Sequence, residues 1–211
     1  MTANLILLLS ALMEFGAMAT ATAAPQSTHT QGGQAQEAHH EPNIVIETSD
    51  GAIHVELFQS KAPATVANFL RYVEAGAYSH GSFHRTVRAN NQPTDQIRID
   101  VIQANDNNDF QKHEFAPIRL ETTKTTGLHH LNGTLSMARD TPDSATASFF
   151  ICIGEQPSLD FGGKRNPDGQ GFGAFGRVTD GMKVVRAIQQ AKAEAQLLQP
   201  PIEILRVSRC Q

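Results

Sequence analysis

The residue best suited to chemistry is an arginine at the centre of a predicted strand. Arg85 follows Phe83 and His84 in a run of strand-forming residues. A guanidinium stays charged and offers rigid, planar donors, so it can stabilise an electron-rich atom. From the residues alone two interpretations of Arg85 stay open, a functional cation or a surface arginine in a salt bridge.

Other reactive side chains fall outside the common catalytic patterns. The chain contains no GxxxxGK loop, no dinucleotide glycine fingerprint, no HExxH and no GxSxG. Two cysteines are too few for a disulfide-rich scaffold or a zinc finger. Cys152 lies in an apolar run and is most simply a core residue, although a disulfide with Cys210 stays open in an oxidising compartment. We expect no metal site at His129 and His130, which lie beside leucines in a predicted loop.

The composition favours one globular domain with a short extension. The chain has 211 residues, 40% hydrophobic and 18% charged, so a buried core is expected. Lys and Arg number 17 against 21 Asp and Glu, which gives a net charge of −4. Because there is no basic excess to neutralise phosphates, nucleic acid is not an expected partner.

Residues 1–23 have the pattern of a secretory signal peptide, with an apolar core at 5–9 and a small-x-small cleavage site at 21–23. No Lys or Arg precedes the apolar core and Glu14 interrupts the segment, so an uncleaved anchor or a wrongly assigned start codon stays open. Glu14 would be costly at the centre of a bilayer. We therefore expect a periplasmic or secreted protein without stable membrane insertion after cleavage of the leader.

Residues 24–42 contain no aliphatic side chain larger than alanine, which predicts a disordered polar linker before a globular domain over 43–211. Apolar side chains at i, i+3, i+4 and i+7 predict a helix that ends at Gly76, and a second helix is expected near 181–190. Predicted strands fall at 44–46, 53–57, 82–87, 97–103, 133–138, 149–153, 172–178 and 202–207. This pattern predicts a mainly β fold, an eight-stranded antiparallel barrel capped by two α-helices.

An ordered series of motifs resembles the cyclophilin family of peptidyl-prolyl cis-trans isomerases. The motifs are the helix sequence Ala62-Pro63-x-Thr65-Val66-x-Asn68-Phe69, then Phe83-His84-Arg85, Gly133–Ala138, Ser148–Cys152, Leu159-Asp160 and Gly173–Val178. The resemblance spans roughly Asn43 to Val207, and residues 159–178 look more like a bacterial branch of the family. It implies a cyclophilin-like barrel and an isomerase.

The resemblance implies catalysis of rotation about the peptide bond before proline. This rotation has a barrier of about 18–20 kcal/mol because amide resonance is lost. No bond is made or cut, so no nucleophile, metal or cofactor is expected. In the twisted state the prolyl nitrogen regains a lone pair, which a fixed N–H donor stabilises more than it stabilises either planar form. Arg85 matches the family's catalytic arginine and would supply that donor.

The resemblance also implies a groove for proline-containing segments of unfolded or folding proteins. Gln103 matches the glutamine that hydrogen-bonds the substrate backbone. Phe150 matches the floor of the proline pocket, and Leu159 matches its wall. Met137 and Ala138 match the groove strand, whose backbone would pair with an extended peptide.

The predicted groove departs from the family pattern at several positions. Asp100 and Val101 stand where the family usually has a phenylalanine and a methionine, which predicts a smaller and more polar wall. Arg139 replaces a groove asparagine, and Ser148 replaces a glutamine. Phe172 replaces a groove histidine, and we expect its ring to pack on proline.

Two features of the chain bear on how this groove is built. The segment 88–98 lengthens the connection between Arg85 and Gln103 beyond the usual family spacing, which predicts a polar loop beside the site. Phe149 and Phe150 are neighbours on a predicted strand and must face opposite sides, so only one of them can belong to the core.

Three functions therefore compete. The first is a monomeric exported isomerase that assists protein folding. The second is a cyclophilin-like proline-peptide-binding module or chaperone with little turnover, motivated by Asp100 and Val101. The third is a structural barrel or a metal-carrying envelope protein that relies on the histidine-rich linker. An exchange assay on an X–Pro peptide separates the first two, and native mass spectrometry with and without a chelator tests the third.

Overall fold

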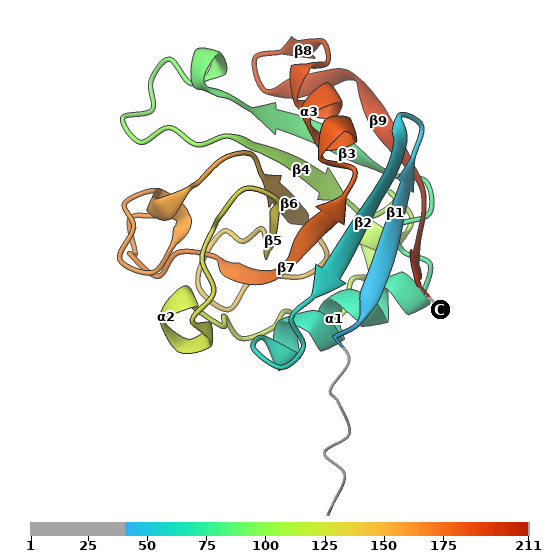
Figure 1. The fold of residues 1–211 in the computed structure, drawn as a ribbon, viewed down its shortest axis with the longest axis horizontal. Coiled ribbons are helices and arrows are strands. Elements are labelled where there is room, and N and C mark those ends of the chain that lie inside the picture. Colours follow the sequence, from blue (N-terminus) through green and yellow to red (C-terminus); the bar gives the residue numbers. More distant parts are fainter. Residues whose placement is uncertain (1–40, 211) are drawn as a thin grey trace, which may run out of the picture. The chain divides into compact units, whose positions relative to one another are not determined.

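The computed structural model describes residues 41–210, so the predicted signal peptide and nearly all of the predicted linker lie outside the described residues. Within that part of the chain, nine strands and three α-helices form a mainly β fold (Figure 1). The strands are β1 Asn43–Thr48, β2 Gly51–Leu57, β3 Gly81–Val87, β4 Val101–Asn105, β5 Thr134–Met137, β6 Phe149–Cys152, β7 Gly173–Asp180, β8 Ala193–Glu194 and β9 Leu197–Arg209. The α-helices are α1 Pro63–Glu74, α2 Thr123–Thr126 and α3 Met182–Gln190. None of these helices could cross a membrane, because each is too short or too polar.

Eight of the strands close into a barrel through antiparallel pairing. Their order is β1-β2-β7-β5-β6-β4-β3-β9, and β9 pairs back onto β1. The short strand β8 pairs only with β9, as a hairpin. The predicted eight-stranded barrel is confirmed, and its closure leaves no long free strand edge.

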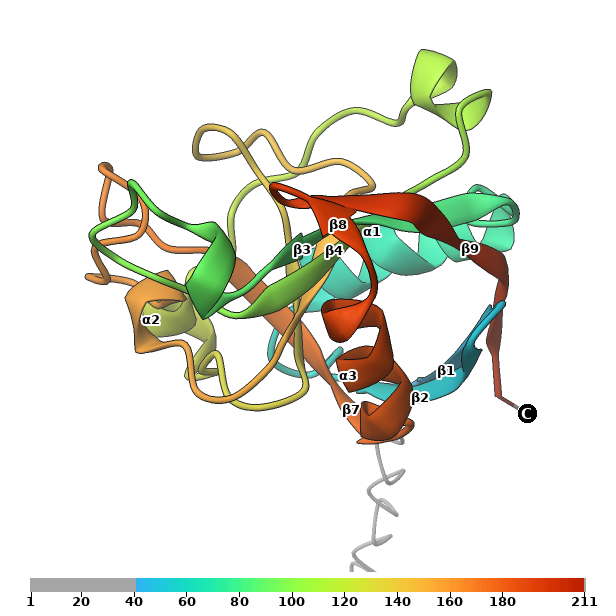
Figure 2. The same ribbon diagram turned by 90° about the horizontal axis from the view of Figure 1, so that it is seen from above.

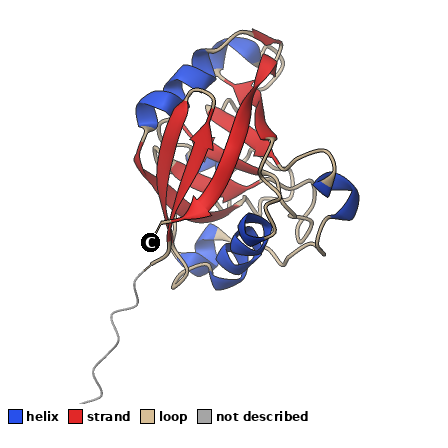
Figure 3. Ribbon diagram, turned by 90° about the vertical axis from the view of Figure 1, so that its right-hand side faces the viewer, coloured by secondary structure: helices blue, strands red, loops and turns tan. Residues whose placement is uncertain are grey.

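The helices lie outside the ring of strands. Helices α1 and α3 lie on opposite sides of the barrel (Figures 2 and 3). Pro63 opens α1, where its missing N–H costs nothing, and the buried face of α1 carries Val66, Phe69, Leu70 and Val73. The sequence predicted two helices, and the additional helix α2 is a single turn that ends at Thr126, with Gly127 as its C-cap.

The strand β6 separates the barrel core from the outer surface. Phe149 is fully buried inside the barrel, where its ring makes edge contacts with Phe69 and Tyr78. Phe150 belongs to a second, smaller apolar cluster that also contains Val101 and Leu159. The two neighbouring phenylalanines therefore face opposite sides, as the strand alternation requires.

The last strand begins earlier than predicted. β9 starts at Leu197 rather than near residue 202, although Pro200 and Pro201 cannot donate to a ladder. The ladder between β3 and β9 is interrupted there, because Phe83 pairs with Ile202 whereas Arg85 pairs with Leu197. This irregularity accommodates the prolines and brings the turn before β9 alongside Arg85.

Candidate active site

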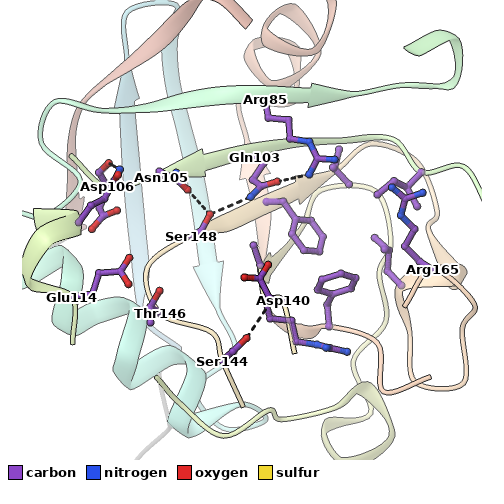
Figure 4. Close-up of a pocket in the computed structure, with 18 residues that line it drawn as sticks. Arg85, Gln103, Asn105, Asp106, Glu114, Asp140, Ser144, Thr146, Ser148 and Arg165 are labelled. Carbon is purple, nitrogen blue, oxygen red and sulfur yellow. Dashed lines mark hydrogen bonds between the residues drawn. The ribbon is translucent and has the colours of Figure 1, made fainter. Parts of the chain in front are cut away.

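A cleft of about 540 Å³ opens beside β3, β4 and β6. Figure 4 shows its lining side chains, with Arg85 and Gln103 close together and the acidic residues Asp106 and Glu114 lying away from Arg85. One part of the lining consists of Arg85, Ile99, Val101, Gln103, Ala138, Arg139, Ser148, Phe150, Leu159, Arg165 and Phe172. The rest consists of Asn105, Asp106, Gln111, Glu114, Asp140, Ser144 and Thr146. The cleft therefore combines an apolar slot, a central arginine and a polar, acidic end.

Arg85 is held by two glutamines. Its Nε donates to Oε1 of Gln196 at 2.9 Å and its Nη2 donates to the same oxygen, while its Nη1 donates to Oε1 of Gln103 at 3.0 Å. Burial and the nearby charge of Arg165 lower the pKa of Arg85, yet a guanidinium stays protonated at neutral pH. A guanidinium has five N–H groups, so two N–H groups of Arg85 are left for a ligand.

Gln103 continues this network across the cleft. Its Nε2 donates to Oγ of Ser148 at 3.3 Å, and that hydroxyl lies 3.0 Å from the carbonyl oxygen of Ala104 and also contacts Oδ1 of Asn105. Figure 4 traces the hydrogen bonds from Arg85 to Asn105. Because its carbonyl oxygen is engaged by Arg85, Gln103 presents its remaining amide hydrogen as a donor.

An apolar slot lies beside the arginine. The rings of Phe150 and Phe172 meet edge to face, with centroids 5.3 Å apart. Leu159 is fully buried, and Val101 and Ile99 complete the slot. An apolar slot of this kind can hold a pyrrolidine ring while excluding water.

The floor of the slot rests on a buried polar network that the sequence analysis missed. His130 stacks on Phe150 with ring planes 16° apart, and its Nε2 lies 2.9 Å from Oγ of Ser136. Its Nδ1 lies 2.6 Å from a carboxylate oxygen of Asp160. Burial raises the pKa of Asp160, but hydrogen bonds from His130 and His129 bring it below its ordinary value. Ser136 is fully buried and does not line the cleft, so this array supports Phe150 and presents no nucleophile.

Arg139 lines the cleft but its guanidinium is engaged by the protein itself. It makes a two-pronged contact with Asp168 at 2.8 and 2.9 Å and donates to the carbonyl oxygen of Gly171 at 2.8 Å. The same group lies 5.3 Å from the ring centroid of Phe172. Because its side chain is only 1% exposed, Arg139 braces Phe172.

The structure brings the predicted site residues together with one exception. Arg85, Val101, Gln103, Ala138, Arg139, Ser148, Phe150, Leu159 and Phe172 all line the cleft. The side chain of Met137 is buried in the barrel core, and its backbone lies between Phe149 and Gly173 of the neighbouring strands. The N–H of Ala138 donates to the carbonyl oxygen of Ser148 at 2.8 Å, so it is already paired.

The expected polar wall is wrong. Asp100 does not line the cleft, because its carboxylate accepts a hydrogen bond from Nε2 of Gln189 on α3 at 3.2 Å. The strand β4 begins at Val101 rather than at residue 97, where the predicted strand begins. Asp100 lies just before it and turns toward α3, whereas Val101 and Gln103 alternate onto the cleft face. The wall is therefore apolar.

The segment 88–98 lies beside the cleft and is firmly tied to it. The side chain of Gln92 is buried and pairs with both the N–H and the carbonyl oxygen of Ile99, at 3.1 and 2.7 Å. Arg165 donates to the carbonyl oxygen of Ile97 at 2.7 Å and forms an ion pair with Asp95. The extra residues thus deliver Ile99 to the slot, which the sequence analysis did not predict.

Comparisons with known proteins agree with this geometry. A family model described as "Cyclophilin type peptidyl-prolyl cis-trans isomerase/CLD" matches residues 43–210. The chain is 39% identical over 150 residues to peptidyl-prolyl cis-trans isomerase cyp18 of Streptomyces antibioticus, which covers 71% of this chain and 84% of that protein. It is 34% identical over 147 residues to peptidyl-prolyl cis-trans isomerase B of Escherichia coli, which covers 69% of this chain and 83% of that protein.

Solved structures share the fold. The crystal structure of a Cryptosporidium parvum cyclophilin-type peptidyl-prolyl cis-trans isomerase matches with a TM-score of 0.66 at 21% identity, covering 81% of this chain and 98% of that chain. A crystal structure of the same protein in the presence of the dipeptide Ala-Pro gives a TM-score of 0.65. The chain therefore belongs to the cyclophilin-type family of peptidyl-prolyl cis-trans isomerases, and the predicted enzyme class is confirmed.

Proposed function

We propose that this cyclophilin rotates X–Pro peptide bonds in exported proteins, with Arg85 as its catalytic residue and a proline ring in the slot over Phe150. The observation that carries the proposal is the position of Arg85 and Phe150 in one cleft, with Gln103 between the polar and apolar walls. The substrates are proline-containing segments of unfolded or folding proteins.

Arg85 acts by binding the twisted amide more tightly than the planar one. Gln196 and Gln103 fix the guanidinium plane, so an unpaired N–H is ready for the prolyl nitrogen when its lone pair appears. By analogy with oxyanion holes, one such donor contributes about 3–4 kcal/mol, and each 1.36 kcal/mol is tenfold in rate. Gln103 and the apolar slot supply the grip on the flanking backbone and ring.

Export is supported by the sequence pattern of residues 1–23. In cells of the source organism, the exported fraction should contain a protein that starts at or near Ala24. N-terminal sequencing of the fractionated protein tests this, and an intact leader on a cytoplasmic protein would overturn the exported role while leaving the isomerase untouched.

The test of catalysis is NMR exchange on an X–Pro peptide. We expect the protein to accelerate cis–trans exchange well above the uncatalysed rate. Without a catalyst, one isomerisation takes tens to hundreds of seconds. Phe150→Ala should lose peptide affinity and rate together. Binding of the peptide without accelerated exchange would instead support a proline-peptide-binding module. The sequence motivation for that module is an altered wall at Asp100 and Val101. Val101 lines the cleft, whereas Asp100 does not and instead binds Gln189.

A further inference from the structure

The end of the cleft beyond Gln103 carries uncompensated negative charge. Asp106 lies at its base and is only 3% exposed, and its Oδ2 has no hydrogen-bond partner among the described residues. Glu114 lines the same end, and the exposed Asp140 lines the cleft farther from Asp106 (Figure 4). Gln111 and Thr146 complete this acidic end of the cleft with neutral polar groups.

No cation of the described chain neutralises the acidic end. Among the described residues, none of Asp106, Glu114 and Asp140 forms an ion pair with a Lys or Arg. The cleft arginines Arg139 and Arg165 pair with Asp168 and Asp95, and Arg85 is bound by Gln103 and Gln196, away from the acidic end (Figure 4). Burial and the charge of Glu114 raise the pKa of Asp106 to about 6, so Asp106 is still largely ionised at neutral pH. The described residues also offer no cluster of three ligands for a metal ion.

We infer that the acidic end of the cleft binds a Lys or Arg side chain of the substrate, two or three residues from the proline. The inference rests on the proposed function and specifies its substrate class. An ammonium or guanidinium group beside the exposed Glu114 would offset the charge of both carboxylates and relieve the repulsion that Glu114 exerts on the buried Asp106.

The spacing along β4 sets the distance between the proline and the basic residue. Val101 lines the slot, Gln103 lies at the centre of the cleft, and Asp106 follows directly after the strand. A strand advances about 3.3 Å per residue, which places Asp106 about 10 Å beyond Gln103. An extended peptide parallel or antiparallel to β4 covers that distance in two or three residues, and the long stem of Lys or Arg can reach into the acidic end.

The test compares peptides that differ at one position. Lys, Gln or Glu is placed two or three residues before the proline, or two or three residues after it, and kcat/KM is measured by NMR exchange. We expect kcat/KM for Lys to exceed that for Gln by about fivefold in at least one of these positions, and Glu to fall below Gln. Rising salt should shrink the ratio.

Variants assign the effect to the acidic end. Glu114→Gln and Asp106→Asn should each lower the Lys-to-Gln ratio of kcat/KM. Glu114 is exposed, so Glu114→Gln tests the acidic end without changing a buried group. Glu155→Gln, an exposed carboxylate outside the cleft, should leave the ratio unchanged. If the Gln peptide is turned over but kcat/KM is the same for the Lys and Gln peptides at every position, the inference is overturned and the proposed function stands. If no peptide is turned over, the proposed function fails, and equal affinities of the Lys and Gln peptides by calorimetry would overturn the inference as well.

Discussion

At the scale of single residues, the orientation of Arg85 depends on a side chain far away in the sequence. Gln196 accepts from two nitrogens of the guanidinium, and its own Nε2 donates to the carbonyl oxygen of Asn91 at 3.2 Å. Gln196 thus anchors one edge of the guanidinium while Gln103 holds another. It is a positioning residue, because it acts through Arg85.

Gln196→Ala should lower kcat about tenfold with little change in KM, because a net 1–2 kcal/mol of anchoring is lost while the peptide-binding surfaces remain. Gln196→Glu keeps the acceptor and should retain most of the rate. Steady-state kinetics by NMR exchange measure both variants, with the exposed Gln59→Ala as the control. Equal rates for Gln196→Ala and Gln59→Ala would contradict the positioning role.

The buried Asp106 should make stability depend on pH. Its pKa is raised from 3.8 to about 6 by burial and by Glu114, so the folded protein holds a proton that the unfolded chain has released between these values. Stability should therefore fall as pH rises from about 4 to 6, by up to about 3 kcal/mol. Asp106→Asn should be more stable than the parent at pH 8 and equal to it near pH 3.5 in denaturant unfolding. If the free energies of unfolding of Asp106→Asn and the parent differ by the same amount at pH 8 and pH 3.5, Asp106 is not the group responsible.

At the scale of elements, the segment between β3 and β4 is part of the slot. Gln92 binds both backbone polar groups of Ile99, so the inserted residues form a fixed wall beside Val101. The buried side-chain amide of Gln92 takes the place of a neighbouring strand, because it binds the two backbone groups of Ile99 that a strand would otherwise bind.

Gln92→Ala should lower the free energy of unfolding by about 1–3 kcal/mol, because two buried backbone groups lose their partner. It should also raise KM, since Ile99 is released from the slot. Urea unfolding and peptide titration measure the two effects. Asn90→Ala in the same segment is the control, because Asn90 is exposed. A stable variant with unchanged KM would show that the wall does not depend on Gln92.

The sequence predicted helices and strands well where the prediction depended on local periodicity. The alternation of Phe149 and Phe150 separated core from cleft, and the motif around Arg85 located the cleft itself. Neighbours on a strand face opposite sides, so the predicted strand at 97–103 already separates Asp100 from Val101, and the resemblance alone suggested that both face the cleft. Gln196 was missed because its place depends on the irregular pairing of β3 with β9, which no local pattern reveals.

At the scale of the whole molecule, barrel closure is what assembles the site. The described strands β3, β4 and β6 are neighbours in the ring although β6 does not follow β4 directly in the chain. The turn before β9 joins them through the β3–β9 pairing. The network beneath Phe150 adds His130, Ser136 and Asp160 from three further segments. The topology could be predicted through resemblance to a family, whereas these long-range polar contacts follow from three-dimensional packing.

The central claim is that a rigid, planar guanidinium stabilises the twisted prolyl amide. The most direct test is cis–trans exchange of an X–Pro peptide at saturating concentration with Arg85→Lys, which keeps the charge but removes the planar donors. The account predicts a fall in kcat of at least about tenfold with peptide affinity within about twofold of the parent, matched by Arg85→Ala. A kcat for Arg85→Lys equal to that of the parent would contradict the account.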